Sequence, residues 1–273
     1  MAIQKGPINL EGQIGDLSFY QSNGKTIVRQ HSGVSKARIA KEPRYARTRE
    51  NNTEFGRASS AAKLIRLAAR QALGERYEIF EDPTSVNRLT PRLSAIVRAD
   101  AEHDRGSRIV RPENLSLLYG FSFNAVAALK DVLFIPPGYT YNRDSGVLEI
   151  SLPALRSGSA IAPPKKAELC SFHIVALSFN EDYEQLPFVV QHHELLPIGH
   201  QAIPAHVYRL ELPTGSTDPM IICFGVSFYI RVGGYPTPIM KKGRNVFEVI
   251  GVDVAGVNSN TTLPMSSSSL HAP

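Results

Sequence analysis

The sequence predicts an α+β protein in which an N-terminal β-hairpin arm and two to three helices precede an antiparallel β-sandwich. Alternating apolar and polar residues flank an Asn-Gly pair near the N-terminus. Apolar residues then recur at helical spacing, first over residues 50–73 and again over residues 91–104. From Phe121 onward, short apolar runs are separated by turn residues without a helical period. An immunoglobulin-like topology is one form that such a sandwich takes.

The expected hairpin consists of residues 13–20 and 26–30. Between them lies Asn23-Gly24, the pair that a type I′ turn favours because both of its central residues need a positive φ. In one continuous strand, Ile14 would lie on the face opposite Leu17. Two strands alone are only marginally stable in water, so we expect the hairpin to pack against its own chain or against a neighbouring subunit.

Residues 33–49 are polar and basic, and Pro43 interrupts them. We interpret them as a solvated connecting arm, with a phosphate-binding patch or a contact to an acidic neighbouring surface as alternatives. Only Tyr45 offers an aromatic ring, which argues against base stacking along a nucleic acid. The basic residues of this arm are Lys36, Arg38, Lys41, Arg44, Arg47 and Arg49.

A first helix is expected over residues 50–73, with Gly74 as its C-cap. Its apolar residues cover most of its girth, and many are alanines that permit close packing. A core within one chain and an interface between subunits explain this face equally well. The main apolar arc contains Ala58, Ala61, Ala62, Ile65, Ala68, Ala69 and Ala72.

A second helix is expected over residues 91–104, with Thr90 as N-cap and Pro91 in its first turn. A short helical turn is expected over residues 112–119, ended by Gly120. The β-rich part follows. Its expected strands are residues 132–135, 147–152, 170–179, 187–192, 205–212, 219–231 and 245–253.

Charge is distributed unevenly along the chain. Residues 1–122 contain 20 Lys and Arg against 13 Asp and Glu, whereas residues 123–273 contain 10 against 12. Opposite net charges would attract the two halves of neighbouring copies to each other, or the basic half to a polyanion. The expected divisions are a hairpin arm (1–35), a basic loop and helical region (36–120), an antiparallel β-sandwich (121–255) and a polar C-terminal tail (256–273).

Composition excludes some classes of protein. No apolar run approaches the length of a membrane span, and the N-terminus lacks the apolar region of a secretory signal. We therefore expect a cytoplasmic protein, with release as part of a particle as an alternative fate. Cys170 and Cys223 are too few for a disulfide framework, so we expect buried thiols in a reducing compartment.

The sequence shows no pattern of an active site. It contains no phosphate-binding glycine loop and no nucleophile elbow. Four histidines cluster at His192, His193, His200 and His206, but adjacent residues of a strand point to opposite faces, which disfavours a metal site. We expect no catalytic, cofactor or metal site and no enzymatic activity.

One pattern resembles a known family. The sequence reads GxIGxLSFY over residues 12–20, continues with Gly24, Arg29 and residues 33–36, and reads RTRENNxEFG over residues 47–56. This resembles the N-terminal signature of a family of uncharacterised Bacteroidetes proteins, as does GFSFN at residues 120–124 followed by VLF at 132–134. The resemblance implies a shared architecture and brings no activity or catalytic residue with it.

These features together favour a non-enzymatic structural protein that assembles with copies of itself, as a subunit of a tube, a filament or a phage-like shell or tail. A β-sandwich binding module that recognises a protein or glycan, through loops such as residues 233–242, is the second hypothesis. A nucleic-acid-binding protein that uses the basic arm is the third. The residues expected at the assembly interface are Leu17, Phe19, Tyr20, Ile27, Val28, Arg47, Arg49 and Phe55.

Overall fold

The structure is a computed structural model that describes residues 2–3, 10–22, 24–30, 34–80, 82–180, 182–240 and 244–256. The chain divides into two compact units, residues 1–52 and residues 53–273. The expected C-terminal tail begins at residue 256, and the rest of it lies outside the described residues. The fold is α+β, as the sequence predicts.

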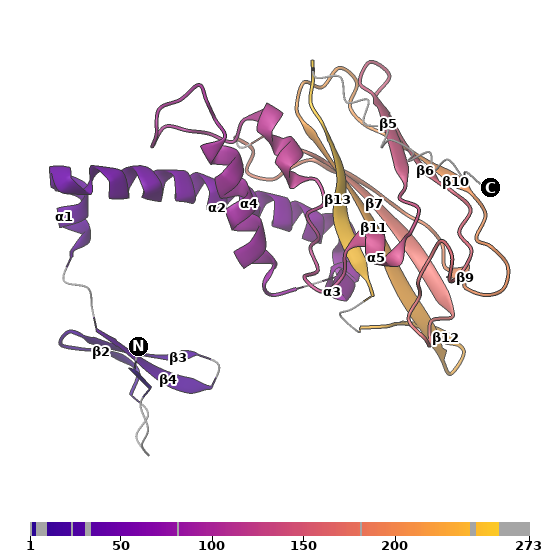
Figure 1. Cartoon of the computed structure of the whole chain (residues 1–273), viewed down its shortest axis with the longest axis horizontal. Helices are drawn as coiled ribbons and strands as arrows, with labels where there is room; N and C mark the ends of the chain where they lie inside the picture. The colour runs from indigo at the N-terminus through magenta and orange to yellow at the C-terminus, as the bar shows by residue number, and fades with distance from the viewer. Residues whose placement is uncertain are drawn as a thin grey trace, which may run out of the picture. The chain divides into compact units, whose positions relative to one another are not determined.

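The first unit contains a four-stranded antiparallel sheet with strand order β1-β4-β3-β2 (Figure 1). The predicted hairpin is confirmed, because β3 and β4 pair along their whole length up to Ser22 opposite Lys25. Gly24 has a φ of 71°, as its place in the turn requires, whereas Asn23 lies outside the described residues. The strands are β1 (Ala2–Ile3), β2 (Gly12–Ile14), β3 (Leu17–Ser22) and β4 (Lys25–Gln30).

One detail of the hairpin prediction is wrong. Residues 13–20 form two strands, because the chain reverses at Gly15, whose φ of 56° suits a tight turn, and Asp16. Ile14 consequently pairs with Leu17 and shares its face, where a continuous strand would have separated them.

The basic arm is helical for much of its length. Helix α1 (Lys36–Lys41) begins at the N-cap Ser35, whose hydroxyl accepts a hydrogen bond from the Arg38 amide at 3.3 Å. Pro43 starts the short helix η1 (Pro43–Tyr45), and α2 (Ala46–Leu73) follows at once. The first predicted helix is therefore confirmed and begins four residues earlier than expected.

The second predicted helix is present with different bounds. Helix α4 (Ser85–Arg98) contains Pro91 in its interior and ends before residue 104, so the expected start at Thr90 and the expected end are both wrong. Upstream, the Asp82 carboxylate accepts hydrogen bonds from the amide and hydroxyl of Thr84, both at 2.8 Å, and this turn precedes the helix. The remaining short helices are η2 (Gly74–Arg76), α3 (Tyr77–Phe80), η3 (Pro112–Leu118) and α5 (Leu129–Val132).

Six of the seven predicted strands are present, and the expected strand at residues 132–135 is wrong. Leu129 and Val132 belong to α5, where the Leu129 amide donates to the Glu248 carboxylate at 2.8 Å. Val132 and Leu133 therefore pack into the core, as the end of a helical turn and a single bridge from Leu133 to Ile161, whereas Phe134 and Ile135 are exposed. The prediction missed β5, β9 and β12.

The strands of the second unit form two sheets. The three-stranded sheet contains β5 (Gly138–Asn142), β6 (Val147–Leu152) and β10 (His206–Glu211). The six-stranded sheet contains β7 (Leu169–Ser178), β8 (Phe188–His192), β9 (Leu196–Pro197), β11 (Met220–Val232), β12 (Tyr235–Pro238) and β13 (Val246–Asp253).

The pairing order of these strands is immunoglobulin-like. Strands β5, β6 and β10 take the places of strands A, B and E of that fold, and β7, β11 and β13 take those of C, F and G. Strand β8 pairs with β7 in the way that C′ extends strand C. All of these pairs are antiparallel.

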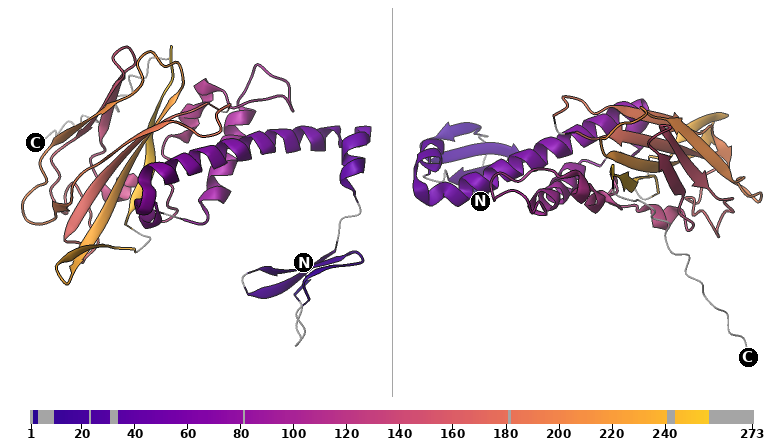
Figure 2. Two further views of the ribbon diagram at one scale, coloured as in Figure 1. Left: turned by 180° about the vertical axis from the view of Figure 1, so that it is seen from behind. Right: turned by 90° about the horizontal axis from the view of Figure 1, so that it is seen from above.

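The second unit has three layers and two apolar cores. Figure 1 and the reverse view in Figure 2 show the six-stranded sheet between a helical layer and the three-stranded sheet. One core joins the helices to one face of the central sheet through side chains such as Ile65, Leu93 and Phe247. The other joins the two sheets through side chains such as Ile150 and Phe224. The predicted alanine arc of α2 is buried in the first core. This face of the helix therefore packs within its own chain and does not form an interface between subunits.

Candidate functional site

The sheet of the first unit, formed by β1 to β4, has apolar side chains on both faces, and none of those described is buried. Cross-strand partners project to the same face. On one face Ile14 is 59% exposed and Leu17 is 41% exposed, with Phe19 and Val28 half-buried beside them. Thr26 is the one buried side chain among the described residues of the first unit.

The opposite face of this sheet is also apolar. Ile3 pairs with Ile27, and Tyr20 pairs with Ile27 from the other side, so the three side chains form a short row. Ile3 and Tyr20 are exposed, and Ile27 is half-buried. A sheet without a core gains little from burying apolar surface, so both of its faces favour contact with another apolar surface.

Three of the predicted interface residues lie on helix α2. Arg47 is solvent-exposed and pairs with Glu50 at 2.9 Å, one turn along the helix. Arg49 donates to the carbonyls of Ile39 and Glu42 at 2.8 and 3.0 Å, so it joins α1 to the start of α2. Phe55 is 60% exposed. The structure therefore leaves Phe55 and Arg47 accessible and gives Arg49 a role within the arm.

The same contacts bear on the basic arm. Glu42 pairs with Arg38 at 2.6 Å and with Arg44 at 2.7 Å. Together with Arg47 and Arg49, four of the six predicted cations of the arm have partners inside the chain. Arg38 and Arg44 share the single Glu42 carboxylate and Arg49 contacts main-chain carbonyls, so these contacts position the guanidinium groups while the arm keeps a net positive charge.

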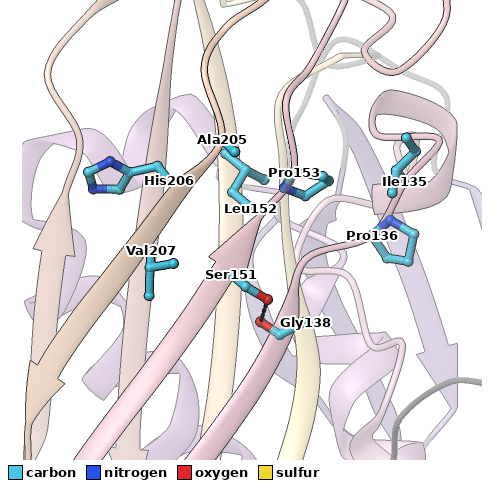
Figure 3. Close-up of a pocket in the computed structure, with 9 residues that line it drawn as sticks. All are labelled: Ile135, Pro136, Gly138, Ser151, Leu152, Pro153, Ala205, His206 and Val207. Carbon is cyan, nitrogen blue, oxygen red and sulfur yellow. Dashed lines mark hydrogen bonds between the residues drawn. The ribbon is translucent and has the colours of Figure 1, made fainter.

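A shallow apolar groove of about 490 Å³ lies on the three-stranded sheet of the second unit. Figure 3 shows its floor, formed by Gly138, Ser151 and Val207 on three neighbouring strands. A Cβ atom at Gly138 would lie 2.9 Å from the Ser151 hydroxyl, so glycine keeps the floor open. Val207 is 58% exposed. The surrounding walls are formed by Ile135, Pro136, Leu152, Pro153, Ala205 and His206.

The loop that the second hypothesis names has a hairpin at its start. Strands β11 and β12 are joined through Gly233 and Gly234, which both have positive φ, and Tyr235 beside them is exposed. Residues 241–242 of this loop lie outside the described residues. The groove lies elsewhere, so the sequence prediction missed it: its lining comes from three separate stretches that only the sheet register brings together.

The predicted histidine cluster divides between two sites. His192 and His193 point to opposite faces, as predicted: His192 faces His173, with the two Nδ1 atoms 3.0 Å apart, and His193 packs beside His206 with ring centroids 5.0 Å apart. His200 is exposed. His173 lies 19 residues before its partner and was not among the predicted candidates, since only the register of β7 and β8 places the two rings together.

The two cysteines are buried, and the described residues contain no cluster of metal-ligating side chains. Cys170 and Cys223 are buried free thiols, as predicted, and burial raises the pKa of Cys170 to about 12. Within the described ranges, no three His, Cys, Asp or Glu side chains are grouped in a way that would hold a metal ion. Among the helices of those ranges, none combines the length and apolar character that crossing a membrane requires.

Comparison of the chain with protein-family models, with curated proteins and with solved structures finds no match. The resemblance to the Bacteroidetes family thus stays a prediction, and the physical features of the chain carry the functional inference.

Proposed function

We propose that this protein is a non-enzymatic structural subunit that assembles with copies of itself through its N-terminal sheet. The observation that supports this proposal is the contrast between the two units. Every apolar side chain described between residues 3 and 52 is at least partly exposed, whereas the second unit buries two extensive apolar cores. Docking on a neighbour would cover the apolar residues that the first unit leaves in water.

Charge adds a second contribution to this proposal. Residues 1–52 contain nine Lys and Arg against four Asp and Glu, a net charge of +5. The whole chain has the same net charge of +5. Residues 123–273 contain 10 against 12. A basic unit without a core would be drawn toward the weakly acidic β-sandwich of a neighbouring copy. Its edge strands β1 and β2 each pair with a single strand among those described, so their outer edges suit strand addition. Repetition of such a head-to-tail contact generates rings, tubes or filaments.

Deletion of residues 1–35 tests this proposal. We expect the truncated chain to keep the melting transition of the second unit, because all buried apolar side chains of the described chain follow residue 57. In size-exclusion chromatography with light scattering, we also expect the truncated chain to elute as a monomer, without the larger assemblies that the full chain forms. A truncated chain that assembles as the full chain does would contradict the proposal. A chain that simply unfolds would instead place the N-terminal sheet in the core of its own monomer.

The second candidate function is that of a β-sandwich binding module, and the groove over Gly138, Ser151 and Val207 favours it. Apart from His206 its walls are apolar, and Ser151 supplies a hydroxyl, which suits an apolar peptide side chain better than a glycan that needs many hydrogen bonds. Replacing Val207 with Asp would place a charge on the groove floor. If the Val207→Asp variant loses affinity for a peptide that the unaltered protein binds, while the mass of its assemblies stays the same, the result would support this function. Unchanged peptide binding by the variant would exclude the groove as the binding site.

A further inference from the structure

His173 and His192 form a hydrogen-bonded pair between a central strand and its neighbour. His173 lies in β7 and is fully buried, and His192 ends β8 directly opposite it. Their Nδ1 atoms are 3.0 Å apart, so one ring must donate and the other must accept. Strand β8 pairs in the sheet with β7 alone among the described strands, and the two histidines face each other at the end of this pairing.

His173 also has a partner at its other ring nitrogen. The Ser227 hydroxyl lies 2.7 Å from His173 Nε2 and 3.2 Å from the Tyr229 hydroxyl, and a hydroxyl can donate or accept in each contact. Neutral His173 therefore satisfies both contacts by donating through one ring nitrogen and accepting through the other, and His192 Nδ1 takes the complementary role. Every member of this chain of hydrogen bonds is satisfied while His173 is neutral.

Two protonated rings have no place in this arrangement. Protonation of both His173 and His192 would set two N–H groups against each other at 3.0 Å. The groups around the pair offer no compensation: Phe80 of α3 packs edge-on against the His173 ring at 5.5 Å, and Arg76 of η2 adds positive charge nearby. No carboxylate among the described residues bonds to either ring. Burial, the neighbouring His192 and Arg76 hold the pKa of His173 well below its ordinary value, and burial and Arg76 lower the pKa of His192.

We propose that the His173–His192 pair is a proton-sensitive latch that holds β8 on β7 at neutral pH and releases it in acid. Release of β8 would expose the edge of β7, whose main-chain groups then become available for pairing with another strand. The latch lies wholly within the second unit and does not depend on assembly through the N-terminal sheet.

The sign of the effect follows from linkage. Both histidines have lowered pKa values in the closed state and titrate near pH 6.5 once released. The open state therefore binds more protons, so closure is favoured above about pH 6.5 and weakens as the pH falls. Each histidine contributes up to about a tenfold change in the opening equilibrium per pH unit.

Hydrogen exchange of the full-length protein between pH 7 and pH 5, corrected for intrinsic rates, tests this latch. We expect the protection of the β8 amides to fall by about ten- to a hundredfold per pH unit below pH 6.5, while β11 and β13 stay protected. His192→Gln keeps a donor for His173 but cannot be protonated, so its pH dependence should fall to at most about tenfold per unit. His200→Gln removes an exposed histidine and should behave as the unaltered protein does.

Three results would overturn the latch: equal pH dependence in His192→Gln and the unaltered protein, simultaneous loss of protection in β8 and β11, or no pH dependence in β8. Should the His192→Gln chain fail to fold, NMR titration of the imidazoles in the unaltered protein decides the question. The His173 ring should stay neutral throughout the range in which β8 is protected. Titration of that ring near pH 6.5 in the closed state would contradict the proposal.

Discussion

Replacing Arg143 with Met is expected to lower the free energy of unfolding of the second unit by about 3–5 kcal/mol, measured by urea denaturation. Arg143 is largely buried and its guanidinium joins three segments. It donates to the Asp253 carboxylate at 2.6 Å, to the Asp253 carbonyl at 2.9 Å, and to the carbonyls of Ser216 and Asp218 at 2.7 and 3.0 Å. Methionine would fill similar space but would remove the guanidinium that contacts the buried Asp253 carboxylate and three main-chain carbonyls.

The matched control for this variant is Arg209→Met. Arg209 also faces a carboxylate, that of Glu149 at 3.8 Å, but its side chain is 66% exposed. An exposed pair of this kind contributes about 0–1 kcal/mol, so we expect little change. Equal losses in the two variants would show that Arg143 does not act as a buried clamp between the β5–β6 turn and the end of β13.

A second large loss, of about 3–5 kcal/mol, is expected for Phe247→Ala. Phe247 is fully buried, and its ring lies 5.7 Å from that of Phe80 and 5.0 Å from that of Phe123, measured between centroids. It therefore links strand β13 to the helical layer. The cavity left by alanine would remove contacts on both sides at once.

Phe134→Ala serves as the comparison for this variant. Phe134 is exposed, and its truncation should change the unfolding free energy by no more than about 0.5 kcal/mol. Urea titrations of both variants, with and without residues 1–35, would show whether the core of the second unit is independent of the first. A Phe247→Ala loss as small as that of Phe134→Ala would contradict the layered core described above.

Local patterns in the sequence identified most of the sandwich. Strands such as β6 and β11 have pronounced apolar runs between turn residues. Runs of this kind predict a strand reliably when one or both of its faces are buried. Strand β5 was missed because GYTYN has no aliphatic run, and it pairs because β6 provides a neighbouring edge. Residues 132–135 were assigned to a strand since a short apolar run does not distinguish a strand from a helical turn.

The candidate sites depend on pairing between distant segments. The Asn-Gly turn predicted the β3–β4 hairpin, whereas the reversal at Gly15 was hidden within an alternating run. The groove floor and the histidine pair each require a cross-strand register, between β5, β6 and β10 in one case and between β7 and β8 in the other. Such registers are set by tertiary packing and have no local signature.

The central claim is that the N-terminal sheet finds its apolar contacts in another copy of the chain. Light scattering of the purified full-length protein over a dilution series measures this directly. The account predicts species with masses that are multiples of 30.0 kDa and that grow with protein concentration. A single species of 30.0 kDa at every concentration would contradict it.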